Sequence, residues 1–459
     1  MIALILLLAG QAMASMDGSI LTVTAPSLRA DLHASGAELQ LVLAVYTIAF
    51  ATVVVTGARL GDVLGRRRTF LLGLAGFTLA SLAGGLAPTT PVLIVARAFQ
   101  GGCAALMTPQ VLSIIQLQFE GQMRARAVGA YSLILAVGVA AGQVLGGLIV
   151  GAHLLAAAWR PALLLNAPIG AALLLGAFRW LPDRAAGPPR RLDLAGAALL
   201  AAALLGLVLP LTLGRDSNWP LWVWPTLAAS VVILCAFAWL ERRLKIRGGD
   251  PLFDLEVMLL AGVAAGVAAV VLVMATYSGF LLSLTLHLQE GLHFTPLRAG
   301  LTFALYACGF GTASLTWTRT NSNVQSRLPV LGPITMGGAL LAIGIVAERL
   351  GWSAALTAPL LFAGGVGHAL GFSPLVHRLT EAVRPTEAAD LSGLLSTASL
   401  IGNVLGVATF AGIYLGGAAH GSGHALAVTT LVLATALLAT TACGAHAMHN
   451  IRPRLDQAD

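Results

Sequence analysis

The chain has 459 residues, of which 58% are hydrophobic and only 10% are charged, and its mean hydropathy is +0.87. A soluble protein carries roughly 25% charged residues, so this composition excludes a water-soluble globular protein of 47.0 kDa. We therefore interpret the chain as an integral membrane protein.

Apolar stretches long enough to cross a bilayer recur along the whole chain. A membrane helix needs about 20 mostly apolar residues, and this length predicts about fourteen helices. They cover residues 3–26, 40–60, 69–87, 91–116, 127–151, 160–181, 194–213, 222–240, 257–282, 297–318, 328–347, 353–375, 391–416 and 424–446. The alternating pattern of an outer-membrane barrel does not occur. Residues 12–14 resemble a signal-peptidase site, but the apolar run continues to Pro26, which favours an intact first helix.

Basic residues are distributed unevenly over the predicted loops. If both termini are cytoplasmic, 20 of the 26 Lys and Arg residues lie in inner loops and five in outer loops. Basic residues accumulate on the cytoplasmic side of membrane proteins, so this bias supports the helix count. It also accounts for the net charge of +7 without a nucleic-acid partner. We expect a multi-pass protein of the cytoplasmic membrane with both termini in the cytoplasm.

Motifs for metal, nucleotide or enzyme chemistry do not emerge from the sequence. The spacing of the cysteines fits neither a zinc site nor a disulfide framework, and we predict no metal site. No Gly-x4-Gly-Lys-Ser/Thr loop occurs, which argues against direct use of ATP. The predicted helices also leave no soluble catalytic domain, so we do not expect an enzyme or a receptor.

Asp17 is the only carboxylate well inside a predicted span, about two-thirds of the way along the first one. Ionisable residues are costly inside a membrane and are usually functional. A carboxyl group at this depth can carry a proton across the membrane or pair with a cationic solute. The alternative is that the helix begins later and that Asp17 caps its end.

Arg97 lies early in the fourth span, within residues 96–102. A guanidinium group inside a membrane needs an acidic or carbonyl partner, and Asp17 is the candidate on charge. The alternative is that Arg97 extends towards the outer lipid headgroups.

Glycine and charged residues alternate over residues 57–68, which we place in the loop between the second and third helices. The candidate residues are Gly57, Asp62, Gly65, Arg66 and Arg67. The glycines permit a tight turn and close helix approach, and Asp62 can pair with an arginine or cap a helix N-terminus. Such a cluster can latch two halves of a protein on the cytoplasmic face, although charged inner loops are also common in general.

The fifth span carries a stripe of small residues, with candidates Gly129, Gly138, Gly142, Gln143, Gly146 and Gly147. Gly138, Gly142 and Gly146 recur every four residues on one helix face. Small residues at this spacing let membrane helices approach closely. General tight packing is the alternative explanation.

Taken together, these segments resemble the major facilitator superfamily, and specifically its fourteen-helix drug:proton antiporters. Residues 16–26 are similar to the family's first-helix signature, and residues 57–68 look like motif A. The fifth-span glycines look like motif C, the antiporter motif, and residues 159–170 look like the opening of the sixth helix. Motif B is represented by Arg97, Gln100, Gly101 and Pro109.

The resemblance implies an all-α polytopic membrane protein with two six-helix bundles, residues 1–183 and 251–459, and two inserted membrane helices, residues 190–245. In this superfamily the solute site lies between the bundles at mid-membrane. By the same resemblance, Asp17 would be a protonation site and Arg97 its partner or a proton relay. Asp62 and Arg66 would belong to an inner latch, and motif C would form a bending, sealing helix face.

The sequence also departs from the family pattern. Gln143 stands where motif C usually has proline, which predicts a helix without the usual kink, and Thr22 replaces an expected asparagine. Residues 319–327 lack a second copy of motif A. In the C-terminal half, Glu290 and Asp390 lie near helix ends rather than at mid-membrane, which favours monocationic over dicationic substrates.

We expect a secondary transporter that exports small organic compounds, hydrophobic or monocationic, in exchange for protons. Its partners would be the small-molecule substrate, protons and the lipid bilayer, and it would act as a monomer. It would need no cofactor, because the proton gradient supplies the energy. Two alternatives are the export of an endogenous metabolite and proton-independent facilitation with a structural Asp17.

Overall fold

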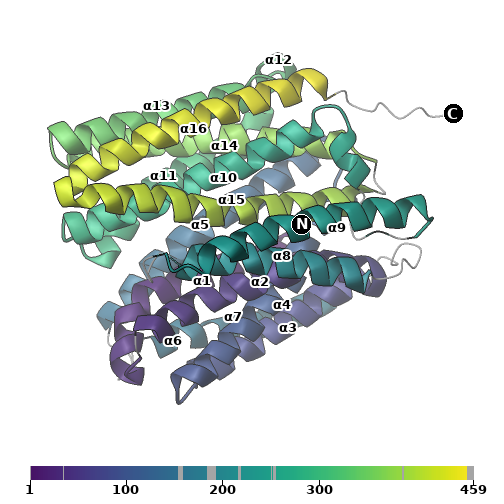
Figure 1. Cartoon of the computed structure of the whole chain (residues 1–459), viewed down its shortest axis with the longest axis horizontal. Coiled ribbons are helices and arrows are strands. Elements are labelled where there is room, and N and C mark those ends of the chain that lie inside the picture. The colour runs from purple at the N-terminus through teal and green to yellow at the C-terminus, as the bar shows by residue number, and fades with distance from the viewer. Residues whose placement is uncertain are drawn as a thin grey trace. The chain divides into compact units, whose positions relative to one another are not determined.

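A computed structural model describes residues 2–34, 36–152, 159–182, 193–214, 219–249, 251, 255–384 and 387–451. Within these ranges every regular element is a helix. This confirms the expected all-α fold class. The helices group into two compact units, which we call unit 1 and unit 2 (Figure 1).

Unit 1 consists of Met1–Gln118 and Gly138–Leu255. Within it, α4 packs against α2 and α3, and α8 packs against α9 and α2. Its helices are α1 (Ile2–Leu32), α2 (Gly36–Leu64), α3 (Arg66–Gly85), α4 (Thr90–Gln118), the second half of α5 (Gly121–Ala152), α6 (Arg160–Leu164), α7 (Asn166–Trp180), α8 (Leu194–Leu213) and α9 (Val223–Ile246).

Unit 2 consists of Phe119–Val137 and Glu256–Asp459. Within it, α13 packs against α14 and α16, and α10 packs against α15 and α16. Its long helices are the first half of α5, α10 (Val263–Leu286), α11 (Pro296–Thr316), α13 (Leu328–Arg349), α14 (Ala354–Glu381), α15 (Ala388–Gly417) and α16 (Ser422–Asn450). Short elements are η1 (Leu255–Leu259), η2 (His287–Gly291), η3 (Trp317–Arg319), α12 (Ser322–Gln325) and η5 (Ala418–His420). The predicted three-part division of the chain stays a prediction.

Each predicted span overlaps helical structure, but residues 160–181 fall on two helices, α6 and α7, and α10 begins six residues after the predicted start at residue 257. Several other helices extend beyond the predicted ends. Among the described residues, ten helices are long and apolar enough to cross a membrane. An eleventh is α2, if its two parts, Leu41–Val54 and Thr56–Leu64, form one span across a 49° bend. The remaining helices at predicted spans are α5, α8 and α11, so the number of crossings stays a prediction.

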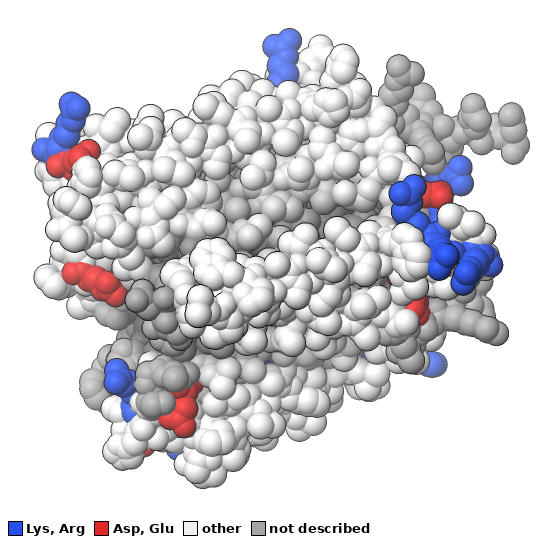
Figure 2. Space-filling view, viewed as in Figure 1, with Lys and Arg blue, Asp and Glu red and all other residues white. Residues whose placement is uncertain are grey.

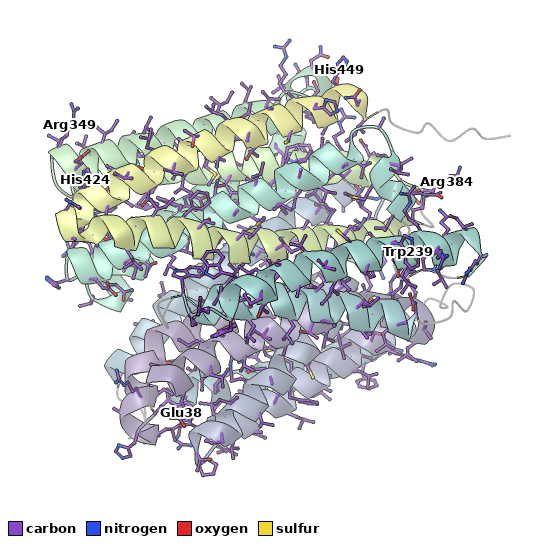
Figure 3. The ribbon with its side chains drawn as sticks, viewed as in Figure 1. Glu38, Trp239, Arg349, Arg384, His424 and His449 are labelled. Atoms are coloured by element: carbon purple, nitrogen blue, oxygen red, sulfur yellow. The ribbon has the colours of Figure 1, made fainter. Side chains whose placement is uncertain are left out.

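The placement of charged residues explains why these helices suit a membrane. On the face drawn in Figure 2, the charged side chains lie near the helix ends, and the surface along the helices is uncharged. In Figure 3, Arg349 and His424 lie at one end of unit 2 and His449 at the other. A helix that is apolar all round is stable only where lipid or protein surrounds it.

Residues 57–68 differ from the expected loop. Gly57 to Leu64 belong to α2, Arg66 to Arg68 begin α3, and Gly65 alone joins the two helices with φ of 90°. Glycine accepts this left-handed backbone without a steric penalty. Gly57 and Gly61 lie inside α2 and form no turn. A Cβ at Gly57 would collide with the backbone of Ala105 in α4, so close helix packing requires glycine there.

Candidate functional site

Asp17 lies in the middle of α1, and its side chain is 0% exposed. Its carboxylate is enclosed by side chains from α4 and α7. Oδ1 accepts hydrogen bonds from Gln100 Nε2 at 2.8 Å and from Asn166 Nδ2 at 2.7 Å, and Oδ2 is paired with the Arg97 guanidinium. Asp17 therefore does not cap a helix end, and its charge is balanced inside unit 1.

Arg97 is 1% exposed, so its guanidinium does not extend to the lipid headgroups. Besides Asp17, Nη1 donates to Gln100 Oε1 at 2.7 Å. The guanidinium carbon lies 4.5 Å from the ring centroid of Tyr46 in α2, a separation at which a cation is attracted to an aromatic face. Arg97 thus keeps two favourable contacts that do not depend on the charge of Asp17.

Small residues bring these helices close enough for the contacts to form. A Cβ at Gly101 would collide with the backbone carbonyl of Tyr46, so α2 and α4 touch at this level. One turn of helix away from Arg97, Gln100 Nε2 also donates to Ser81 Oγ of α3 at 2.6 Å. Pro109 lies farther along, inside α4. The motif B residues therefore place one cation and one amide against α1, α2 and α3.

The motif A residues form a second charged group. Arg66 Nη2 donates to Asp62 Oδ1 at 3.0 Å, and Arg59 Nη1 lies 3.8 Å from Asp62 Oδ2. Arg59 Nη2 donates to the backbone carbonyl of Pro251 at 2.7 Å, and Arg67 Nη2 donates to that of Phe178 at 2.7 Å. Within unit 1 this group therefore holds the segment after α9 and the end of α7.

The motif C glycines are sites of close helix contact. Within unit 2, a Cβ at Gly129 would collide with the carbonyl of Ser314 in α11. Within unit 1, Cβ atoms at Gly138 and Gly142 would collide with α1 at Ser15 and Met16. Helix α5 runs without interruption from Gly121 to Ala152 through Gln143, Gly146 and Gly147. The side chains of Gln143 and Thr22 lie outside the described residues.

Trp159 and Arg160 form an ion-paired contact at one end of unit 1. Trp159 Nε1 donates to Asp31 Oδ2 at 3.0 Å, and Arg160 Nη2 lies 3.3 Å from the same oxygen. Arg160 Nη1 donates to the carbonyls of Gly85 and Ala87. These bonds join the ends of α1 and α3 to the start of α6.

Sequence reasoning missed Asn166 and Ser81 as partners of the charged pair. Asn166 belongs to the sixth-helix pattern, but nothing in its spacing indicates that it faces Asp17. The carboxylate is therefore satisfied more completely than the charge-based prediction of a single partner implies.

Sequence reasoning also missed a buried histidine in unit 2, His368, which is hydrogen-bonded to the hydroxyl of Tyr306. A repeat in the sequence would have indicated this place. Residues 41–50 and 301–310 share four identical positions: the first segment is Leu-Val-Leu-Ala-Val-Tyr-Thr-Ile-Ala-Phe and the second is Leu-Thr-Phe-Ala-Leu-Tyr-Ala-Cys-Gly-Phe. The tyrosines of the two segments are Tyr46 and Tyr306. A Cβ at Gly365 in α14 would collide with the Tyr306 carbonyl, as one at Gly101 would with that of Tyr46.

The site of unit 1 is thus a buried ion pair between α1 and α4 of an all-helical chain, within the described residues. The family model described as Major Facilitator Superfamily matches residues 7–407, and this match shows a membrane transporter family rather than an enzyme family. The chain belongs to the major facilitator superfamily.

Its curated relatives include named exporters and resistance proteins. It is 33% identical over 421 residues to a probable actinorhodin transporter of Streptomyces coelicolor, covering 90% of this chain and 72% of that protein. It is 36% identical over 426 residues to a cephamycin export protein of Amycolatopsis lactamdurans, covering 88% and 83%. It is 33% identical over 439 residues to a puromycin resistance protein of Streptomyces alboniger, covering 93% and 85%. These similarities support an exporter.

Solved structures of low sequence identity have the same fold. A proton:xylose symporter superposes with a TM-score of 0.64 at 14% identity, covering 95% of this chain and 94% of that one. A human organic anion transporter superposes with a TM-score of 0.65 at 16% identity, covering 95% and 99%. This likeness confirms the major facilitator fold.

Proposed function

We propose that this protein is a proton-coupled antiporter of the cytoplasmic membrane that exports small organic compounds, with both termini in the cytoplasm. The relatives named for actinorhodin, cephamycin and puromycin support antibiotics and similar compounds as the substrate class. The proton gradient supplies the energy, and the protein acts as a monomer without a cofactor.

The observation that carries the proposal is the buried Asp17–Arg97 pair in the middle of unit 1. The Asp17 carboxylate is 0% exposed, and one cation and two amides balance its charge. Adding a single proton therefore changes this balance. Protonation removes the attraction to Arg97 and leaves the guanidinium with Gln100 and the Tyr46 ring.

The same geometry bears on how proton and solute exchange. Because protein donors occupy both carboxylate oxygens, a cationic solute reaches Asp17 only after Arg97 has moved. Coupling then acts through the pair: proton binding breaks it and alters the packing of α1 against α4, and proton release restores it. Asp17 is the proton site in this scheme, and Arg97 is the group that responds.

Transport in everted membrane vesicles tests the proposal. Ethidium and puromycin serve as probes, first selected by whether the protein protects an efflux-deficient bacterial host against them. We expect the wild type to take up the protective probe when the vesicles are acidified inside, with measurable proton release from the lumen. Asp17→Asn should abolish the dependence on the pH gradient.

Asp31→Asn is the matched control, since Asp31 is an exposed carboxylate of the same helix, paired with Arg160. It should retain coupled uptake. Undiminished coupled exchange in Asp17→Asn would remove Asp17 from the mechanism. Uptake by the wild type that ignores the pH gradient would instead establish a facilitator.

Export of an endogenous product is the second candidate, because two relatives are named for the transport of antibiotics rather than for resistance. A deletion strain separates the two functions. Intracellular accumulation of a native metabolite with unchanged drug susceptibility would establish metabolite export, whereas sensitivity to added drugs would establish drug efflux.

A further inference from the structure

His368 is a buried polar residue of unit 2 that the proposed coupling mechanism does not use. It lies near the middle of α14, and its side chain is 2% exposed. Its Nδ1 lies 3.1 Å from the hydroxyl oxygen of Tyr306 in α11. A polar ring at this depth of a membrane helix is costly and indicates a function.

Aromatic rings surround His368, and we name this group the His368 cluster: His368, Tyr277, Tyr306, Phe310 and Phe372. The centroid of the His368 ring lies 4.8 Å from that of Tyr277, 4.7 Å from that of Phe310 and 6.3 Å from that of Phe372. Tyr277 and Tyr306 are stacked at 6.0 Å. The cluster is therefore a set of ring faces and edges contributed by α10, α11 and α14.

Two buried polar atoms of the cluster have no hydrogen-bond partner in the described part of the chain: His368 Nε2 and the Tyr277 hydroxyl. A neutral imidazole has one donor and one acceptor nitrogen. If Tyr306 donates to Nδ1, then Nε2 is an unused donor, and if Nδ1 donates to Tyr306, then Nε2 is an unused acceptor. Either tautomer leaves one hydrogen-bonding capacity for another molecule.

The cluster occupies the place in unit 2 that the charged pair occupies in unit 1. Tyr46 contacts Arg97 of α4 in unit 1, and Tyr306 contacts His368 of α14 in unit 2. The two tyrosines stand at matching positions of the repeated segments, each against a glycine of the neighbouring helix. Unit 1 has the Asp17–Arg97 ion pair at this place, whereas unit 2 has a histidine ring that can form hydrogen bonds and is surrounded by aromatic rings.

We propose that the His368 cluster binds the exported compound, and that it selects planar aromatic compounds that carry a phenolic hydroxyl or a ring carbonyl. Stacking on the aromatic rings favours a flat ring system. The hydroxyl of Tyr277 and His368 Nε2 bind the oxygen substituents. This inference rests on the proposed export function.

Equilibrium dialysis of the purified full-length protein in detergent tests the inference with two flat three-ring probes. They are 1,8-dihydroxyanthraquinone, which carries hydroxyl and carbonyl oxygens, and anthracene, which carries none. Tyr277→Phe and His368→Phe should each weaken binding of the hydroxylated probe about tenfold, the effect of losing about 1.4 kcal/mol. Binding of anthracene should stay within about twofold, because the ring surface is kept.

Tyr414→Phe is the matched control, because it removes a tyrosine hydroxyl from α15 of the same unit, and it should bind both probes as the wild type does. Thermal unfolding of each variant identifies loss of folding. Tyr277→Phe loses a hydroxyl without a partner, so its melting temperature should not change. Unchanged binding of the hydroxylated probe in a folded Tyr277→Phe variant would overturn the inference, as would equal losses for both probes.

Transport separates this inference from the function on which it rests. Proteoliposomes that bind 1,8-dihydroxyanthraquinone through Tyr277 but show no pH-dependent transport would refute the antiport mechanism and retain the site. Proteoliposomes with proton-coupled transport of ethidium or puromycin and no effect of Tyr277→Phe on binding of the anthraquinone would refute the site and retain the antiporter.

Discussion

At the scale of single residues, the charge balance of Asp17 is the main feature. Its two oxygens accept from one guanidinium and two amides in a place without exposure. A buried ion pair gives little net stability compared with apolar packing, but removing one partner leaves an uncompensated charge. The pair therefore constrains both residues together.

Asp17→Asn should lower the free energy of unfolding, because Arg97 then remains charged and buried. Breaking a buried pair costs about 3–5 kcal/mol. We expect the free energy of unfolding to fall by about 3 kcal/mol, the low end of that range, since Gln100 and the Tyr46 ring still contact the guanidinium. Thermal unfolding in detergent measures the change. Adding Arg97→Gln should recover most of the loss.

The control for this change is again Asp31→Asn, whose carboxylate and the Arg160 guanidinium are 32% and 27% exposed. Exposed pairs contribute about 0–1 kcal/mol, so its melting temperature should change little. Equal effects of the two substitutions would mean that burial of the Asp17 pair has no energetic consequence.

At the scale of helices, glycines decide which pairs of helices touch. Neighbouring glycines of α4 differ sharply: a Cβ at Gly101 would collide with the Tyr46 carbonyl, whereas one at Gly102 would find its nearest atom, Val53 Cγ2, at 3.9 Å. Backbone cannot rotate away as a side chain can. The contact of α2 with α4 thus depends on one of two adjacent glycines.

Gly101→Ala should therefore destabilise the protein, and Gly102→Ala should not. Overpacking of a close contact costs about 1–3 kcal/mol. Alanine at Gly102 meets ordinary van der Waals contact and gains up to about 1 kcal/mol of helix propensity. Melting temperatures of the two variants measure the difference, and a Gly101→Ala variant as stable as Gly102→Ala would contradict the close contact.

At the scale of the whole molecule, the unequal distribution of basic residues fixes the expected orientation in the membrane. The segment between α11 and α13 carries Arg319 and Arg327 and belongs to the predicted inner side. The turn between α15 and α16, around His420, belongs to the predicted outer side. Both segments expose side chains that can be labelled.

Labelling of single cysteines in intact cells tests this orientation. In a background without the four native cysteines, His420→Cys should react with a membrane-impermeant maleimide, and Asn323→Cys should react only after the cells are permeabilised. Because each crossing reverses the side, one crossing more or fewer before either position would invert its result. The reverse pattern would place both termini outside.

The sequence was sufficient to predict the helices and the charged pair, because a carboxylate and a guanidinium are rare inside apolar spans. It was insufficient for Asn166, Ser81 and His368. In a helix that is apolar all round, periodicity does not show which face meets another helix. Small polar side chains and a lone histidine therefore give no direction until neighbouring helices are placed.

The region of residues 57–68 shows a different limit. Its glycines predict a turn, and only Gly65 provides one, whereas Gly57 permits contact with α4. Turn formation and close packing require the same residue type for different physical reasons. Local sequence alone does not distinguish them.

The single-residue junction at Gly65 has a mechanical consequence. Leu64 ends α2 and Arg66 begins α3, so the connection has no additional residues that could absorb a displacement of one helix. Tilting of the end of α2 must therefore move the first turn of α3 directly, and with it Arg66, Arg67 and Arg68. A longer connection would let the two helices move separately, whereas this one-residue connection couples the movement of α3 to that of α2.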